Sequence, residues 1–416
     1  MATESAEPSA TVVWSDRFLD YTWTPEHPMK PARLDLTMAL ARELGVLSGV
    51  ETVRAEPAGM PDLLRVHTPE YIDAVRHAVP ESAPRPNRPT APLFGLGSDD
   101  NPVFPGMHDA ASVIVGGTLA AAREIAEGRT RRAVSIGGGM HHAMANSAAG
   151  FCIYNDAAVA ISWLLDHGFD RIAYVDVDVH HGDGVQRAFY GDPRVLTVSV
   201  HQHPATLWPS TGWPDEVGAG PAEGTALNLA LLPGTRDAAW LRGFHAVVPG
   251  ALAAFRPQIL ISQCGVDTHR EDPLADLELT VDGQVAAFRA MRELADRYAD
   301  GRWLAVGGGG YGLIRVVPRA WTQLLATALD RPLPPETPVP EAWRERARVI
   351  APRVEPPTVM GEGGDTRYQP WDGPGGAVDT GDAQVDRARR AVDTAVLATR
   401  RATFGLLGLD PEDPRD

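Results

Sequence analysis

Residues 171–186 (RIAYVDVDVHHGDGVQ) hold the densest group of side chains that could do chemistry. The first half, Ile172 to Val179, is apolar and β-branched, as in a strand buried on both faces. Two aspartates lie inside it, and burying a carboxylate is costly unless a cation meets it. Because side chains alternate along a strand, Asp176, Asp178 and His180 should project from the same side. The pattern predicts a divalent cation bound by Asp178 and His180, with Asp176 anchoring a neighbour. A solvated strand end would explain fewer of these polar groups.

A second group is the adjacent pair His141 and His142, which follows three glycines in GGGMHHA. Glycine lets the backbone approach a ligand closely, and on a loop both imidazoles can face one pocket. A carboxylate that accepts a hydrogen bond from Nδ1 fixes the tautomer of a histidine and raises its basicity. An isolated pair of histidines is more often structural. With Asp176 and Asp183 available as partners, however, we expect two histidine–aspartate pairs.

Asp267 and Tyr311 each follow a further apolar segment. Asp267 supplies the third donor of a catalytic zinc-type site, which leaves one position open for water. Two carboxylates and one imidazole form a rather hard donor set, for which Fe(II) or Co(II) could compete with zinc. Tyr311 follows four glycines, and a buried phenol needs a hydrogen-bond partner. We expect that partner to be a substrate oxygen, the alternative being a core aromatic after a turn.

Three other residues have suitable chemistry but no suitable surroundings in the sequence. His201 and His203 alternate along a strand end, but the metal already has three better candidates, so we interpret both as structural. Cys152 has no base placed beside it, and we interpret it as a pocket-wall or core residue.

A regular scaffold must position these groups. Five apolar segments each run into glycine or polar residues, at 133–136, 172–179, 195–200, 258–262 and 303–306, with helical segments at 157–166, 234–254 and 281–300. This alternation is typical of an α/β fold with a mostly parallel central β-sheet flanked by helices on both faces. In such sheets ligands bind at the carboxyl ends of the strands, where the polar groups fall.

The rest of the chain suggests one large domain with a C-terminal extension. We expect a disordered lead at 1–10, a short strand at 11–14, helices at about 32–47, 68–79 and 109–127, and a long loop at 80–106. A single catalytic domain would then cover 11–330. Residues 331–382 read as a Pro/Gly-rich connector, and 383–416 as a C-terminal helix and tail. We favour packing of this helix on the body over binding of a partner.

Composition narrows the class of protein. The 416 residues are 44% hydrophobic and 22% charged, as in ordinary globular proteins. A net charge of −16 argues against direct binding of nucleic acid, which needs a basic face. With only two cysteines, no signal peptide and no long apolar run, we expect a cytoplasmic protein outside the membrane.

Six segments, in this order, resemble the zinc-dependent histone deacetylase superfamily: GGGMHHA, AGFCIYND, YVDVDVHHGDGVQ, SVHQHPATLWPSTG, CGVDTHREDPL and GGGGYG. The resemblance covers residues 11 to 330. Three more segments look most similar to its bacterial acetoin-utilisation branch: HPMKPARL, GSDDNPVFPGMHDAAS and DRARRAVDTAVLATRRATFGLLGL.

The resemblance implies the arginase/deacetylase fold, a bound Zn²⁺ and hydrolysis of the acetyl amide of Nε-acetyl-lysine in a protein or peptide. Its metal ligands would be Asp178, His180 and Asp267. Its catalytic groups would be the pairs His141–Asp176 and His142–Asp183, with His142 as base and acid, and Tyr311 as donor to the substrate carbonyl.

The resemblance also implies a substrate tunnel and a second cation. The tunnel would be lined by Gly150, Phe151 and Trp208, with Leu274 at its rim and Asp100 holding the substrate backbone. A structural K⁺ would lie at Asp176, Asp178, His180, Ser199 and Val200. Trp208 stands where the family commonly has phenylalanine, so the width of the tunnel should differ.

Three other functions compete with this interpretation. A binuclear manganese ureohydrolase would need extra carboxylate ligands that bridge two metals, and the histidine pair with Tyr311 fits a mononuclear deacetylase better. A non-catalytic reader of acyl-lysine should have lost a ligand, a pair or the tyrosine. The same chemistry on acetylpolyamines is the third, although the acetoin-utilisation resemblance favours protein acetyl-lysine, plausibly on an acyl-CoA synthetase.

Overall fold

The computed structural model describes residues 10–80, 93–376 and 381–416. Within them, eight strands form one sheet in the order β2-β1-β3-β8-β7-β4-β5-β6, and every neighbouring pair is parallel. The strands are β1 (Thr11–Trp14), β2 (Thr52–Arg54), β3 (Arg132–Ser135), β4 (Ile172–Asp176), β5 (Val195–Gln202), β6 (Ala226–Leu231), β7 (Ile259–Gln263) and β8 (Trp303–Val306). Apart from β2, each of these strands is fully buried.

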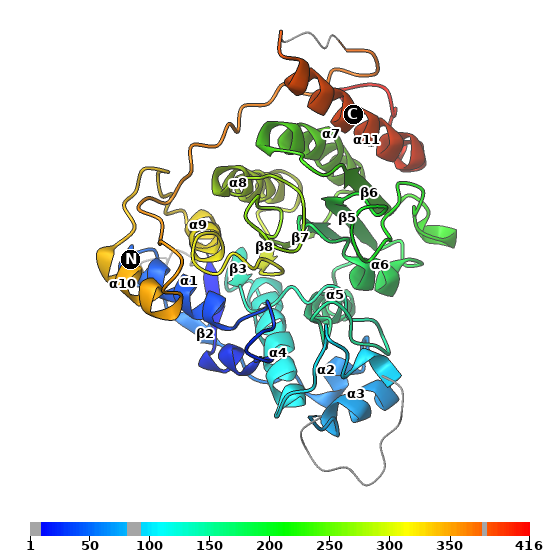
Figure 1. Cartoon of the computed structure of the whole chain (residues 1–416). Coiled ribbons are helices and arrows are strands. Elements are labelled where there is room, and N and C mark those ends of the chain that lie inside the picture. The colour runs from blue at the N-terminus through cyan, green and yellow to red at the C-terminus, as the bar shows by residue number, and fades with distance from the viewer. Residues whose placement is uncertain (1–9, 81–92, 377–380) are drawn as a thin grey trace, which may run out of the picture.

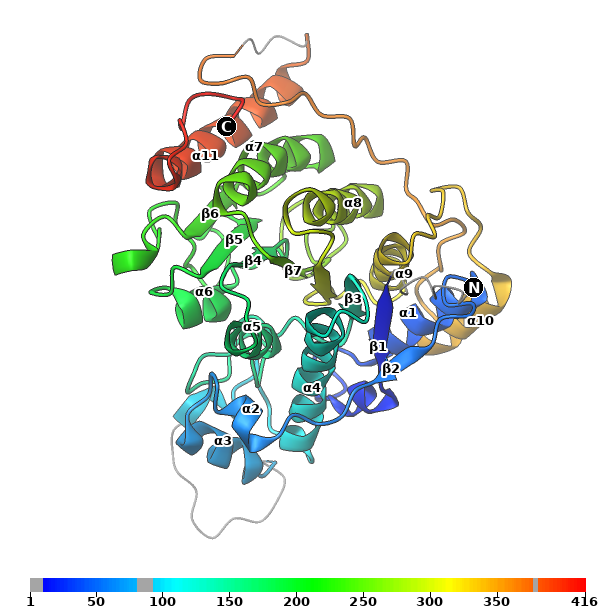
Figure 2. The same ribbon diagram turned by 180° about the vertical axis from the view of Figure 1, so that it is seen from behind.

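Helices cover both faces of the sheet, as a buried parallel sheet requires. They are α1 (Ala32–Glu43), α2 (Met60–Leu63), α3 (Pro69–Arg76), α4 (Met107–Ala126), α5 (Asp156–Asp166), α6 (Asp183–Phe189), α7 (Asp237–Phe255), α8 (Val281–Tyr298), α9 (Val317–Ala328), α10 (Glu341–Ile350) and α11 (Ala383–Thr403). In Figures 1 and 2, α1, α9, α8 and α7 follow one another along one face, and α4, α5 and α6 cover the other.

The predicted α/β class and parallel sheet are confirmed, and so are the six predicted strands. The edge strands β2 and β6 and the helices α2, α6, α9 and α10 were not anticipated. β2 is only three residues long and largely exposed, so it carries no burial pattern that a sequence could display. The predicted lead at 1–10 lies outside the described residues apart from residue 10, as does the 81–92 part of the predicted loop.

The strand predicted at 172–179 ends earlier, at Asp176. Carboxylates take up the backbone N–H groups that follow. Asp178 N donates to Asp176 Oδ1 at 3.1 Å, and His180 N donates to Asp178 Oδ1 at 3.0 Å. These local bonds compete with the strand ladder. Asp178 and His180 therefore lie on the loop after the strand, and the prediction that they belong to the strand itself is wrong.

Two elements of the C-terminal extension pack on the body of the molecule. Trp343 of α10 is fully buried against α1, where its Nε1 donates to Leu36 O at 2.9 Å. α11 lies beside α7 and the edge strand β6 (Figure 1), and Thr399 Oγ1 donates to Asn228 O of β6 at 2.7 Å. The interpretation of α11 as a helix packed on the body is therefore confirmed.

Glu362, between α10 and α11, ties the extension to the loop after β7. Its Oε2 lies 2.9 Å from His269 Nε2, and its Oε1 accepts a bond from Arg319 of α9. All three side chains are nearly or fully buried. Burial opposes ionisation, but His269 and Arg319 outweigh it and lower the pKa of Glu362 to about 2. This pairing reaches from the extension to the residues that follow Asp267.

Candidate active site

Four neighbouring strands, β3, β8, β7 and β4, end at the same edge of the sheet, because all of them are parallel. The polar segments singled out in the sequence follow these strands directly. The loops therefore meet at the carboxyl edge, which is where open α/β sheets bind ligands.

The loops after β4 and β7 bring together Asp178, His180 and Asp267, and one donor atom of each lies within 4.8 Å of the others. His180 Nδ1 is 3.3 Å from Asp178 Oδ1 and 3.3 Å from Asp267 Oδ2. Both carboxylates are fully buried and the imidazole is largely buried. Val179 N donates to Asp267 Oδ1 at 2.8 Å, so the backbone of one loop orients the ligand on the other.

These three residues fit a divalent metal. Two buried carboxylates this close together repel each other unless a cation lies between them. A Cβ at Gly309 would lie 2.0 Å from Asp267 Oδ2 and 2.9 Å from Asp178 Oδ2, so the glycine keeps space free beside both carboxylates. One imidazole and two carboxylates suit Zn²⁺, Fe²⁺ or Co²⁺.

Both histidine–aspartate pairs form as predicted. His141 Nδ1 lies 2.8 Å from Asp176 Oδ2, and His142 Nδ1 lies 2.7 Å from Asp183 Oδ1. The two rings are 3.9 Å apart, and the ring of His142 is 5.8 Å from that of His180. Both imidazoles therefore face the metal group from one side.

The two imidazoles have opposite pKa shifts. Burial lowers the pKa of His141, but Asp176 and Asp178 outweigh this effect and raise it to about 9. Burial lowers the pKa of His142 to about 4, and the positive charge of His141 adds to that shift. At neutral pH, His142 is therefore the neutral imidazole that can accept a proton.

The loop that carries the histidines is held by two residues of the FCIYND segment. Asp156 accepts bonds from Gly139 N at 3.0 Å and from Met140 N at 2.7 Å. Asn155 Nδ2 donates to His141 O at 3.3 Å, while its Oδ1 caps α5. The capping role can be read from a sequence, but the contacts with a loop more than ten residues away cannot.

Tyr311 lines the same cavity as the two histidines. Burial raises the pKa of Tyr311 well above its usual value, and Asp267 and Asp178 add to this, so the phenol stays protonated and able to donate. Its ring lies 5.7 Å from that of Phe151. A cavity of about 20 Å³ lies between these groups, roughly the space of one water molecule. It is lined by Met29, Gly139, Met140, His141, His142, Gly150, Phe151, Cys152, Asp178, His180, Gly308, Gly309 and Tyr311.

Trp208 packs against His142 and His180. Its ring is 4.6 Å from that of His142, and 44% of the residue is exposed, so it reaches from the histidine to the surface. Gly150, with a φ of +50°, lies beside the rings of His142 and Trp208. A Cβ there would lie 2.4 Å from His142 Cδ2. Only glycine therefore allows this close approach.

The remaining predicted residues lie around this centre. Leu274 is half-buried, and Asp100 is exposed, with its carbonyl 3.2 Å from His27 Nε2. Ser199 pairs with Asp176 across β5 and β4, with Val200 next to it. His201 is buried outside the metal group, with its ring nitrogens bonded to Ser199 Oγ and Gly212 O.

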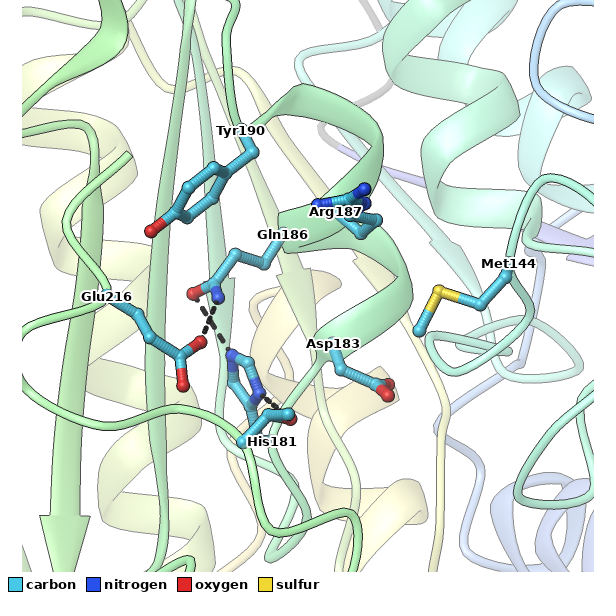
Figure 3. A pocket seen from close by; sticks show the side chains of 8 residues that line it. Met144, His181, Asp183, Gln186, Arg187, Tyr190 and Glu216 are labelled. Atoms are coloured by element: carbon cyan, nitrogen blue, oxygen red, sulfur yellow. Dashed lines mark hydrogen bonds between the residues drawn. The ribbon is translucent and has the colours of Figure 1, made fainter. Parts of the chain in front are cut away.

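A larger pocket of about 370 Å³ adjoins the His142–Asp183 pair on the side of Asp183 (Figure 3). Asp183 lines this pocket and also bonds His142. On the opposite wall, Gln186 donates to Glu216 at 2.8 Å and lies 3.1 Å from His181 Nε2. Glu216 in turn accepts a bond from Gly212 N, which fixes the loop that carries Trp208. The pocket therefore backs the site and does not contain its metal group.

Comparisons with known proteins agree with this geometry. Residues 27–328 match the histone deacetylase domain family. Acetoin utilization protein AcuC of Bacillus subtilis is 37% identical over 368 residues, which cover 85% of this chain and 94% of that protein. The AcuC protein of Staphylococcus aureus (strain MSSA476) is 36% identical over 321 residues, covering 77% and 82%.

Solved structures give the same answer for the fold. An HDAC homologue from Aquifex aeolicus has a TM-score of 0.76 and 27% identity, and an HDAC homologue complexed with SAHA has a TM-score of 0.78 and 28% identity. Each comparison covers 93% of this chain and 99% of the other. The arginase/deacetylase fold is confirmed. The chain therefore belongs to the histone deacetylase family of metal-dependent deacetylases.

Proposed function

We propose that this protein removes the acetyl group from Nε-acetyl-lysine in proteins, releasing acetate and the free lysine side chain. The proposal rests on one observation: three kinds of group meet at one narrow cavity. These are the Asp178–His180–Asp267 metal group, two histidine–aspartate pairs and a protonated phenol. Hydrolysis of an amide needs a nucleophile, a proton carrier and a stabiliser for the carbonyl oxygen, and these groups can serve all three.

Asp178, His180 and Asp267 would hold a Zn²⁺, with Fe²⁺ or Co²⁺ as alternatives. When bound, the metal supplies Lewis-acid polarisation of the amide carbonyl and makes a water molecule more acidic. The chain itself supplies the proton transfers and part of the charge stabilisation.

His142 is the base that accepts a proton from the attacking water and the acid that then protonates the leaving amine. Asp183 holds its Nδ1–H, so Nε2 is left free to accept the proton. His141 is held by Asp176, which also accepts a hydrogen bond from the hydroxyl of Tyr174. His141 favours the charged form and acts by electrostatics. A cation at Asp178 would weaken the shift of His141 and lower the pKa of His142 further, so their order would remain.

Tyr311 donates its hydroxyl hydrogen to the substrate carbonyl oxygen as negative charge develops there. Gly150, Phe151 and Trp208 would line the passage for the lysine stem, Leu274 would form its rim, and Asp100 would hold the substrate backbone at the mouth. The exposed indole of Trp208 is larger than a phenyl ring, so this side of the passage presents more apolar surface.

A structural K⁺ would be held by groups of Asp176, Asp178, His180, Ser199 and Val200, on the side of the loop away from the cavity. The pairing of Ser199 with Asp176 brings β5 to the loop that carries the metal ligands. Such an ion would stiffen this loop. We also propose that residues 11–330 form the catalytic unit, with 331–382 connecting it to the helix and tail at 383–416.

The substrate is proposed to be an acetylated protein, plausibly an acyl-CoA synthetase, because relatives at 36–37% identity are named for acetoin utilization. The main alternative is an acetylpolyamine. The deciding experiment compares kcat/KM for an acetyl-lysine peptide and for acetylpolyamines, with and without a chelator. We expect the peptide to be preferred and chelation to abolish turnover. Preference for the polyamine would overturn the substrate, and chelator-resistant turnover or two manganese ions per active chain would overturn the mechanism.

A further inference from the structure

Asp272 is a buried carboxylate on the loop between β7 and α8, and only 6% of the residue is exposed. Its side chain accepts two backbone hydrogen bonds: Oδ2 from Tyr311 N at 2.8 Å and Oδ1 from Leu274 N at 3.1 Å. Its own N–H donates to His269 O at 2.8 Å. One carboxylate therefore joins the loop of the candidate phenol to the loop of the candidate rim.

The segment before Tyr311 has little conformational restraint of its own. Four glycines separate the end of β8 from the tyrosine, and Gly308 and Gly310 have φ angles of +144° and +128°. Glycine loses the most conformational freedom on folding, so such a segment keeps one shape only where contacts hold it. The place of the phenol therefore depends on groups that bind this backbone.

Those groups hold the segment from several directions. Arg33 Nη1 donates to Gly308 O at 2.7 Å, and Gly309 N donates to Asp178 Oδ2 at 2.8 Å. The N–H of Tyr311 itself is bound by Asp272. The Tyr311 nitrogen is bonded to the Cα that carries the side chain. A hydrogen bond that holds this N–H therefore acts directly on where the phenol hydroxyl lies.

We propose that Asp272 is a positioning residue for Tyr311: it fixes where the phenol hydroxyl lies relative to the substrate carbonyl without touching the substrate. The inference rests on the proposed role of Tyr311 as donor. Asparagine at 272 keeps the shape of the side chain but offers one acceptor oxygen, so it can serve only one of the two N–H groups. Alanine can serve neither.

The kinetic test is a double-mutant cycle of Asp272→Ala and Tyr311→Phe on an acetyl-lysine peptide. With Tyr311 present, we expect Asp272→Ala to lower kcat about 10- to 100-fold and to change KM less than about 3-fold, because misplacing a group by about 1 Å can cost ~10²-fold. In the Tyr311→Phe background, the same change should cost less than about 3-fold, since the donor is already gone. Equal losses in both backgrounds, or a parent-like kcat for Asp272→Ala, would overturn the proposal.

A second measurement needs no substrate. Hydrogen exchange of the fragment covering 307–313 should be faster in Asp272→Asn than in the parent, because the Tyr311 N–H competes with Leu274 for one oxygen. Glu271→Gln is the matched control, since this neighbouring carboxylate bonds the exposed Arg315. Its exchange and kcat should match the parent. Unchanged exchange in Asp272→Asn would overturn the proposal, whereas loss of all peptide turnover in the parent would overturn only the proposed function.

Discussion

His141 and His142 are neighbours in the chain, yet their surroundings give them different chemistry. His141 lies beside two carboxylates, Asp176 and Asp178, while His142 has one carboxylate and a charged imidazole next to it. The histidine–aspartate pairing was predictable from residue types. The difference in pKa was not, because it depends on the 3.9 Å between the rings and on which carboxylates surround each.

This difference predicts the acid limb of the pH profile. A base works only when neutral, and the pKa of His142 is lowered to about 4 by burial and by His141. We expect kcat/KM to stay level as the pH falls from about 7.5 to 5.5, where a histidine of ordinary pKa would already lose most of its activity. The measurement is a pH–rate profile with metal content checked at each pH. An acid limb centred near pH 6.5, with metal retained, would contradict the assignment.

Replacement of Tyr311 by phenylalanine tests the donor. Removing one such donor from an oxyanion typically costs ~10²–10³ in kcat. Because phenylalanine keeps the ring that packs on Phe151, metal content and thermal unfolding should match the parent. Asp178→Asn is the comparison, since it should lose metal and activity together. Near-normal kcat with metal retained in Tyr311→Phe would show that the phenol is only a wall of the cavity.

At the scale of elements, the sequence predicted which strands end in polar groups and which histidines pair with aspartates, but not the other side chains that bridge the loops. β4, β7 and β8 could be found because each is an apolar run that stops at glycine or a polar residue. Asp272 could not be linked to Tyr311, nor Glu362 to His269, because 39 and 93 residues separate the partners and no periodicity connects them. The predicted strand at 172–179 was too long. The sequence does not show that the aspartates accept hydrogen bonds from the nearby backbone and so end the strand.

Glu362 makes a prediction about stability. Its pKa lies near 2 in the folded protein, below the ordinary value of 4.5, so ionised Glu362 stabilises the fold above about pH 4.5, and this contribution is lost as the pH falls toward 2. Glu362→Gln should lower the free energy of unfolding by about 3 kcal/mol at pH 7, because it leaves buried Arg319 without its anionic partner. Urea unfolding of the parent and of Glu362→Gln at pH 7 and pH 4 measures this loss. We expect the difference in the free energy of unfolding between the two proteins to be smaller at pH 4.

The exposed pair Arg236–Glu278 offers the control. Glu278→Gln should change the free energy of unfolding by about 0.5 kcal/mol or less, since exposed ion pairs contribute little. If the two substitutions had equal effects, the buried pairing of Glu362 would not be a stabilising link between the extension and the body.

At the scale of the whole molecule, the net charge of −16 acts on every approaching substrate. We expect acetyl-lysine peptides with flanking arginines to have a kcat/KM about 3- to 10-fold above neutral ones at low salt, with the advantage fading at about 0.3 M salt. The same measurement on Asp100→Asn distinguishes the effect of this one carboxylate from the effect of the net charge of the whole protein. No preference for basic peptides at low salt would remove the steering effect.

The two edges of the sheet differ in a way that matters for solubility. β2, at one edge, is three residues long, largely exposed and ends in arginine, features that discourage pairing with another chain. β6, at the other, reads ALNLAL and has no charge, a sequence prone to form intermolecular β-structure when bare. α11 lies against this strand, and Thr399 occupies one of its carbonyl groups. A chain shortened before residue 383 should therefore aggregate through β6, because α11 normally covers this edge of the sheet.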